Sequence, residues 1–298
     1  MLKGISANND AFVANLSRIQ DRINATNQQI TSGTRVSQAS DDPSAVDPIL
    51  QVQAEMDHIH QVQTNLNTAK TFATTADGAL QTADSIMSQL STLAAQGATS
   101  TQTAATRTAL AQQVQQLEQQ LVSIANTSVQ GRYIFGGDNP TTQPYSFDGT
   151  NPPVAAVASP TNTAVIRDAE GNGIIPGQTA QQAFDSPAGS VFQAVDALRV
   201  ALLNNDQPGI LASTTSLKTA ATQLNLSGQA YGATENWIAN ATQDASQRLT
   251  SLTAQLSGLK DTDVVAAASQ LTTDNAAYSA AIASQATLPT KSLFSYLG

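Results

Sequence analysis

The chain has 298 residues, no cysteine, 41% hydrophobic and only 12% charged residues, and 22 acidic against 13 basic side chains, for a net charge of -9. This balance argues against a nucleic-acid partner, because phosphate backbones are neutralised by clustered cations. Without cysteine there are no disulfides, thiolate metal sites or thiol nucleophiles, and no run of 18 apolar residues is present for a membrane-spanning helix.

Residues 1–42 are predicted to form an N-terminal arm. Large apolar residues recur at helical spacing within residues 9–31, which predicts an amphipathic helix with the stripe Phe12, Leu16, Ile19, Ile23 and Ile30. Gly33 is expected to end this helix. A lone helix buries too little apolar surface to offset the entropy of ordering its backbone, so the arm needs a partner.

Residues 43–137 are predicted to form the long helical hairpin of a middle rod domain. A heptad pattern runs from Ala45 to Gln96, with Asp42 as the expected N-cap and Gly97 as the expected end. Its seam positions are Val52, Ile59, Val62, Leu66, Ala69, Ala73, Ala76, Leu80, Ala83, Met87, Leu90 and Ala94. A second helix is expected from about Thr103 to Val129, antiparallel to the first because the connection is short, with Gly131 ending it.

Residues 138–187 are predicted to form a small β-rich insert. Proline and glycine become frequent, Tyr145 and Phe147 alternate with polar residues, and Glu170–Gly173 has the composition of a tight turn. The abrupt change in composition indicates an outgrowth separate from the helical core. We therefore expect the insert to form the outer surface.

Helical periodicity returns in residues 188–260, the predicted C-terminal helices of the middle rod, with a break at 204–208. Residues 261–298 are predicted to be a C-terminal arm, which begins at the interruption Asp261–Asp263 and has an apolar stripe at Leu271, Tyr278 and Ile282. Heptads at both ends favour pairing of the two arms. The expected fold is mainly α, a long antiparallel helical bundle or coiled coil with terminal helical arms and a small β-rich insert.

No catalytic, cofactor-binding or metal site is expected, and the chain is not expected to be an enzyme. His58 and His60 would point about 200° apart on a helix and cannot chelate one ion. Asp41 and Asp42 could form a carboxylate pair, but Pro43 directly afterwards favours helix capping. The glycines of 131–137 lack the Lys-Ser or Lys-Thr of a phosphate-binding loop.

Several segments together resemble the bacterial flagellin superfamily. In the N-terminal half they are Gln28–Gly33, Ser40–Pro43, Thr75–Leu80, Leu93–Gly97 and Ile124–Thr127, and in the C-terminal half they are Asp261–Asp263 and Leu293–Leu297. The order and spacing of these segments are more specific than any one of them. The residues that carry the family motifs include Asp41, Asp42, Gly131, Arg132, Tyr133, Phe135, Gly136 and Gly137.

The resemblance implies an extracellular structural subunit of the flagellar axis, exported through the flagellar secretion apparatus with a chaperone and without a cleaved signal peptide. The segment 131–137 is most similar to members at the hook–filament junction; flagellin itself is the alternative, and a helical adhesion or signalling rod a more distant one. The implied partners are other copies, an adjacent hook-associated protein and flagellin, with neither nucleic acid nor membrane insertion. The expected assembly interface comprises Ile5, Phe12, Leu16, Ile19, Ile23, Leu271, Tyr278, Ile282, Leu293, Phe294 and Leu297.

Overall fold

The computed structural model describes residues 2–148, 153–158, 163, 165–186 and 189–286. Helices dominate these residues and the strands form small antiparallel pairs, so the predicted mainly α fold with a small β-rich insert is confirmed. The chain divides into two compact units. Unit 1 consists of residues 1–57 and 249–298, and unit 2 consists of residues 58–248. Two helices, α2 (Pro43–Ala98) and α6 (Gln207–Lys260), contribute residues to both units.

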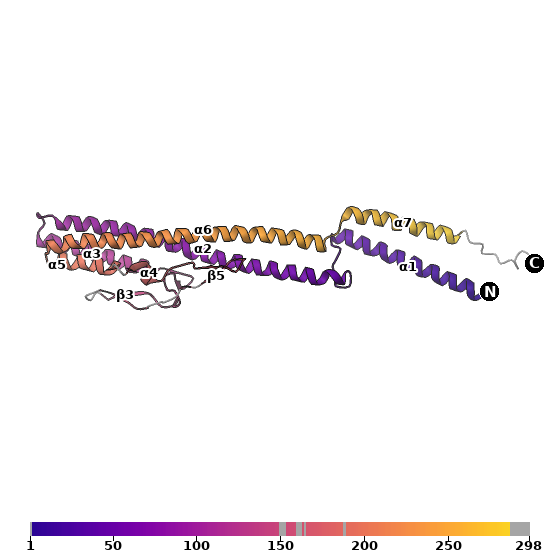
Figure 1. Ribbon diagram of the computed structural model, residues 1–298, viewed down its shortest axis with the longest axis horizontal. Coiled ribbons are helices and arrows are strands. Elements are labelled where there is room, and N and C mark those ends of the chain that lie inside the picture. The colour runs from indigo at the N-terminus through magenta and orange to yellow at the C-terminus, as the bar shows by residue number, and fades with distance from the viewer. Residues whose placement is uncertain (1, 149–152, 159–162, 164, 187–188, 287–298) are drawn as a thin grey trace, which may run out of the picture. The chain divides into compact units, whose positions relative to one another are not determined.

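In unit 1, the first and last helices of the described chain pack against each other. These are α1 (Leu2–Ser32) and α7 (Val264–Ala286), which lie side by side in Figure 1. Gly33 follows α1 with φ +70°, a conformation that glycine adopts without steric cost. Asp263 caps α7, since its side chain accepts the N–H groups of Val265 and Ala266, each at 3.0 Å. The predicted breaks at Gly33 and 261–263 are confirmed, whereas α1 begins well before residue 9.

Backbone hydrogen bonds hold together the two chain reversals of unit 1. The N–H groups of Arg35 and Val36 both donate to the carbonyl of Lys260, at 2.7 and 3.2 Å, and Thr262 N–H donates to Gly33 O at 2.9 Å. These bonds join the connection between α1 and α2 to the connection between α6 and α7. We call this region, residues 33–45 with 257–263, the joint.

In unit 2, α2 and α6 run antiparallel beside α3 (Ala104–Ala125) and α5 (Val191–Leu203) (Figure 1). Two cross-helix hydrogen bonds fix the register, Gln63 to Ser246 at 3.3 Å and Asn225 to Asp84 at 2.9 Å. The residue numbers of both pairs have the same sum, so the register is constant over six turns. All twelve predicted seam residues of α2 are buried, which confirms the heptad pattern.

Two predicted helix ends differ from the structure. Helix α2 continues through Gly97 to Ala98. Gly97 does not end the helix; it lets the side chain of Leu202 approach the backbone of α2, since a Cβ there would lie 2.5 Å from Leu202 Cδ2. Helix α3 ends at Ala125 instead of near Val129, and Gly131 does not end it. Gly131 lies in the tight turn of the hairpin formed by β1 (Ser128–Val129) and β2 (Arg132–Tyr133).

The described residues after β2 contain three further antiparallel strand pairs and one short helix, as expected for a β-rich insert. The pairs are β3 (Tyr145–Phe147) with β4 (Val154–Ala156), β5 (Ile166–Arg167) with β6 (Gly173–Ile174), and β7 (Asp185–Ser186) with β8 (Gly189–Ser190); α4 spans Ala180–Phe184. The predicted turn lies between β5 and β6, where Asp168 accepts the N–H groups of Glu170 and Asn172 and Gly171 has φ +87°.

The expectation that the insert is an outgrowth separate from the core is wrong. Tyr145, Ile174 and Phe184 of the insert are buried in the same hydrophobic cluster as the seams of α2, α3, α5 and α6. The ring of Phe184 lies 5.3 Å from that of Phe135 and 5.8 Å from that of Phe192. The insert therefore completes the core of unit 2, because its aromatic side chains fill space that the alanine-rich helices leave open.

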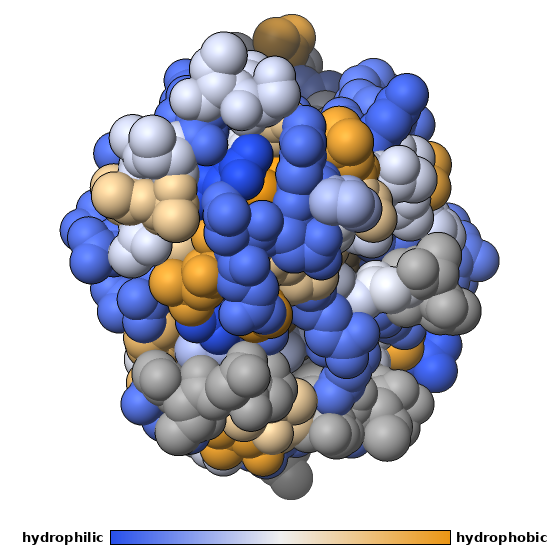
Figure 2. All heavy atoms as spheres, turned by 90° about the vertical axis from the view of Figure 1, so that its left-hand side faces the viewer, coloured by the Kyte–Doolittle hydropathy of each residue, from blue (hydrophilic) through white to orange (hydrophobic). Residues whose placement is uncertain are grey.

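The end of unit 2 at which the α2–α3 and α5–α6 connections lie is largely hydrophilic, with hydrophobic residues in small separate patches (Figure 2). Within the part of the chain that is described, no helix combines the length and the hydropathy needed to cross a membrane.

Candidate assembly interface

The α1–α7 pair contains most of the predicted interface residues. On α1, which packs against α7, Phe12, Leu16 and Ile19 are half-buried and Ile23 is buried. Ile5 also belongs to α1. The stripe of α7 passes through Leu271 and Tyr278, both half-buried, and then through Ala281. Ile282 lies beside the stripe and is 45% exposed, so it is not part of the seam between the two helices. Leu293, Phe294 and Leu297 lie outside the described residues.

A charged pair within this seam was not predicted. Asp274, only 2% exposed, lies at the heptad position between Leu271 and Tyr278, and its Oδ1 accepts a hydrogen bond from Arg22 at 2.7 Å. Arg22 is 58% exposed and reaches the carboxylate from the flank of α1. Oδ2 of Asp274 has no hydrogen-bond partner among the described residues. The sequence feature that could have predicted this pair is the aspartate at a seam position, because a buried charge is costly unless it is paired.

In the joint, the side chains of Asp41 and Asp42 accept hydrogen bonds from backbone N–H groups and so have structural roles. Asp42 Oδ1 accepts the N–H groups of Ser44 at 3.2 Å and Ala45 at 3.3 Å, and its Oδ2 accepts from Arg35 at 2.7 Å. Hydrogen bonding from Ser44, followed by that from Arg35, lowers the pKa of Asp42 to about 2. The predicted N-cap is confirmed.

Asp41 organises the loop that precedes the cap. Its Oδ2 accepts the N–H groups of Ser37 at 2.9 Å and Gln38 at 3.0 Å. The bond from Gln38, with those from Ser37, lowers the pKa of Asp41 below its ordinary value. Both carboxylates are therefore held in the ionised form, and neither is poised to exchange a proton near neutral pH.

The glycine-rich motif shapes the core of unit 2. Phe135 is fully buried and meets the rings of Phe184 and Tyr231 edge-on. Gly136 lies in a tight turn where a Cβ would be 2.9 Å from the Cα of Pro140, and Gly137 has φ +53°. The motif thus turns the chain sharply after β2 and inserts Phe135 between helices and insert.

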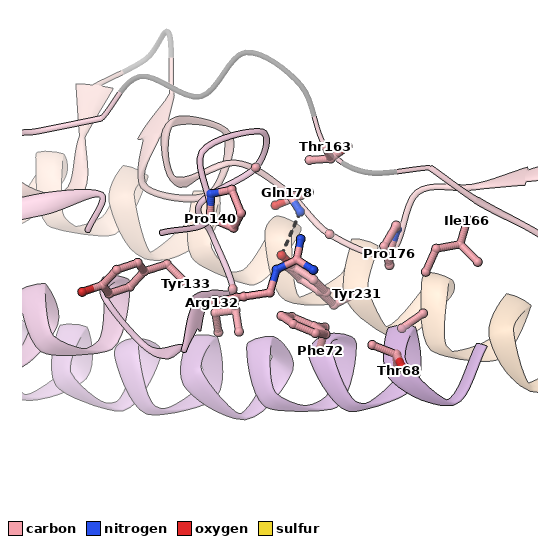
Figure 3. A pocket seen from close by; sticks show the side chains of 14 residues that line it. Thr68, Phe72, Arg132, Tyr133, Pro140, Thr163, Ile166, Pro176, Gln178 and Tyr231 are labelled. Atoms are coloured by element: carbon pink, nitrogen blue, oxygen red, sulfur yellow. Dashed lines mark hydrogen bonds between the residues drawn. The ribbon is translucent and has the colours of Figure 1, made fainter. Parts of the chain in front are cut away.

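Arg132 of the same motif lies at a cavity of about 120 Å³ between α2, the insert and α6 (Figure 3). Its guanidinium lies over the ring of Phe72, 6.0 Å from the centroid, in cation–π geometry. Tyr231 closes the floor, where its hydroxyl oxygen accepts the N–H of Gln178 at 2.8 Å. The cavity is lined mainly by the apolar side chains Ala69, Phe72, Ile134, Pro140, Ile166 and Pro176.

A second buried charge lies on α3. Glu118 is fully buried at a seam position facing α5, and neither of its carboxylate oxygens has a hydrogen-bond partner among the described residues. Burial, with the nearby charge of Asp196 as a second cause, raises the pKa of Glu118 to about 7. Asp196 is itself paired with Arg199. With this pKa, the buried carboxyl group of Glu118 is partly protonated near neutral pH.

Among the described residues, no group of three or more histidine, aspartate or glutamate side chains is arranged to hold a metal ion. The carboxylates of Asp41, Asp42 and Asp274 are bound in a turn, a helix cap and a helix seam, respectively. The α1–α7 pair and the cavity at Arg132 are two surfaces of the described residues that offer apolar contact to another molecule.

Comparison with known proteins agrees with this architecture. A family model described as the bacterial flagellin N-terminal helical region matches residues 5–140, which confirms the resemblance over that part of the chain. No curated protein gives a significant match to the sequence.

Solved structures described as hook-associated proteins share the fold. A structure from Vibrio parahaemolyticus described as a flagellar hook-associated protein is 19% identical, with a TM-score of 0.67 over 74% of this chain and 100% of that one. FlgL from Bacillus cereus is 21% identical, with a TM-score of 0.58 over 70% and 99%. Flagellar hook-associated protein 3 from Legionella pneumophila is 14% identical, with a TM-score of 0.61 over 71% and 98%.

Proposed function

We propose that this chain is a non-enzymatic structural subunit of the flagellum that joins the hook to the filament. Two findings support this proposal: the match to the N-terminal helical region of bacterial flagellins, and the fold shared with solved hook-associated proteins. The subunit acts by self-assembly. Its immediate partners are other copies of itself, and the ends of the assembled layer meet an adjacent hook-associated protein and flagellin.

The observation that carries this proposal is the incomplete burial of the α1–α7 seam. In unit 2, where helices and insert surround the core, seam residues such as Leu66 and Leu121 are fully buried. In the two-helix pair of unit 1, Phe12 and Tyr278 remain half-exposed at positions of the same heptad type. Two helices alone leave part of an apolar seam in contact with water, and further helices are needed to cover it. Copies of the same pair would supply them.

The terminal arms, residues 1–42 and 261–298, are accordingly assigned to an inner coiled-coil layer. Their interface residues are Ile5, Phe12, Leu16, Ile19, Ile23, Leu271, Tyr278, Ile282, Leu293, Phe294 and Leu297. Residues 43–137 and 188–260 form the middle rod, and residues 138–187 face outward. The 45% exposure of Ile282 suits a contact with a neighbouring copy rather than with α1.

Such a subunit works outside the cell and reaches its site through the flagellar export apparatus, with a cytoplasmic chaperone covering the arms until export. Export without a cleaved signal peptide is part of the same proposal. The cysteine-free sequence suits transport through a narrow channel, since no disulfide has to be opened or formed.

Electron microscopy and sedimentation of the purified chain test the proposal. We expect concentration-dependent assemblies of limited length, and loss of these assemblies when residues 1–32 are removed. A strictly monomeric protein at all concentrations would contradict self-assembly. Unlimited filaments formed by the pure protein would favour a filament subunit, flagellin, over a junction subunit.

A further inference from the structure

The guanidinium of Arg132, at the edge of the cavity, carries a positive charge that no described residue neutralises in an ion pair. Arg132 is exposed, and no carboxylate of the described residues forms an ion pair with it. Its only recorded partner is the face of Phe72, which leaves the outer N–H groups of the guanidinium free to bind an anion. Figure 3 shows Arg132 and Phe72 at the cavity, with the Gln178–Tyr231 hydrogen bond as a dashed line.

The size and walls of the cavity limit what can enter. A volume of about 120 Å³ is some ten times the minimum for one water molecule, enough for one or two side chains but too small for a helix. The walls are mainly apolar, with Arg132 as the charged residue and Thr68, Thr163, Gln178 and the two tyrosines as the polar ones. The fitting group is therefore an apolar side chain that has a carboxylate close beside it.

We propose that this cavity receives an exposed apolar side chain from a second copy of this chain, with a neighbouring carboxylate of that copy bound by Arg132. Local charge complementarity favours a second copy, because Arg132 forms no ion pair among the described residues and the same chain presents exposed carboxylates beside exposed apolar side chains. The inference rests on the proposed self-assembly and names one contact within it.

The chain displays surfaces of the required kind. Leu50 is 57% exposed on α2, and the exposed Asp47 lies three residues before it on the same helical face. Val13 is 61% exposed on α1, with the exposed Asp10 in the same relation. Either pair could place a carboxylate at Arg132 while its apolar neighbour enters the cavity.

Replacement of Arg132 tests the charge. Arg132→Gln should raise the concentration needed for assembly about tenfold and make assembly less sensitive to salt. Arg132→Lys should assemble at nearly the wild-type concentration and keep most of the wild-type salt sensitivity. Arg167→Gln is the matched control, since Arg167 is an exposed arginine of the insert whose recorded side-chain bond goes to its own turn. Equal assembly of wild type, Arg132→Gln and Arg167→Gln would overturn the proposal.

A photo-cross-linking amino acid at Thr68, which lines the cavity and is exposed, tests the occupant with Arg132 intact. In assembled protein, we expect cross-links to a second copy near an exposed carboxylate, at Asp47 or Asp10. Cross-links within one copy only, or to segments without a carboxylate, would refute the contact. If the wild type forms no assemblies, both the proposed function and this contact fail; if it assembles and only the Arg132 tests fail, the contact alone is wrong.

Discussion

Two glycines of α2 serve different purposes, although both lie inside one helix. A Cβ on Gly97 would lie 2.5 Å from Leu202 Cδ2, whereas a Cβ on Gly78 would meet nothing within 4 Å. We expect Gly97→Ala to destabilise unit 2 by about 1 to 3 kcal/mol, because the fully buried side chain of Leu202 must shift within a packed core.

The matched variant Gly78→Ala should stabilise the protein by about 0.5 to 1 kcal/mol, because alanine loses less backbone entropy in a helix. Urea titration followed by circular dichroism measures both effects. Equal effects of the two substitutions would show that Gly97 is not a packing site.

Glu118 makes the stability of unit 2 depend on pH. Its folded-state pKa is raised from 4.5 to about 7, so its favourable contribution is complete below pH 4.5 and is lost as pH rises through 7. Glu118→Gln keeps the shape of the protonated form. We expect this variant to be on the order of 2 kcal/mol more stable than wild type at pH 8.5 and nearly unchanged at pH 5.

Thermal unfolding at the two pH values checks this expectation, with Glu170→Gln, an exposed carboxylate of the insert, as the control. The groups that surround Glu118, namely Asp196, Arg199, Asp185 and Tyr145, are unchanged in both variants. A parallel pH dependence of wild type and Glu118→Gln would exclude Glu118 as its source.

At the scale of elements, the heptad pattern predicted α2 and its buried face correctly because a period of 3.5 residues leaves little choice of which side is covered. Polar residues at seam positions were not predicted: Asp274 and Glu118 occupy places where the pattern expects an apolar side chain. The role of the insert was also missed. Composition marks where a segment changes type, but it carries no information on which distant helices Tyr145 and Phe184 contact.

The seam of α1 and α7 predicts an asymmetric response to mutation. Arg22→Gln leaves the buried Asp274 without its cation and should weaken the helix pair by about 1 to 3 kcal/mol. Asp274→Leu removes the buried charge and leaves an exposed arginine, so it should be neutral or stabilising. Hydrogen exchange of α1 amides measures the difference. Arg18→Gln, on the exposed side of α1, serves as control, and equal losses in all three variants would contradict the role of the pair.

At the scale of the molecule, the arms are predicted to act as a switch that becomes fully ordered only in the assembly. The half-buried seam of unit 1 is the physical reason, because contacts with neighbouring copies add the burial that one pair lacks. Replacing Leu16 and Ile23 together by Asp should leave the unfolding of unit 2 unchanged and abolish assembly. Ala14→Asp, at an exposed site of α1 away from the seam, is the control for added charge. Strong amide protection of residues 10–30 in dilute monomer would disprove the switch.

The large separation in sequence between α2 and α6 determines the order in which the helices of unit 2 pair during folding. Gln63 meets Ser246 across 183 residues of sequence, while α3 follows α2 after a connection of only a few residues. Closing the longer loop costs about 3 kcal/mol more in chain entropy. The α2–α3 hairpin should thus form early and α6 should dock late, so that a protein composed mostly of helices folds at the slower rate typical of non-local contacts.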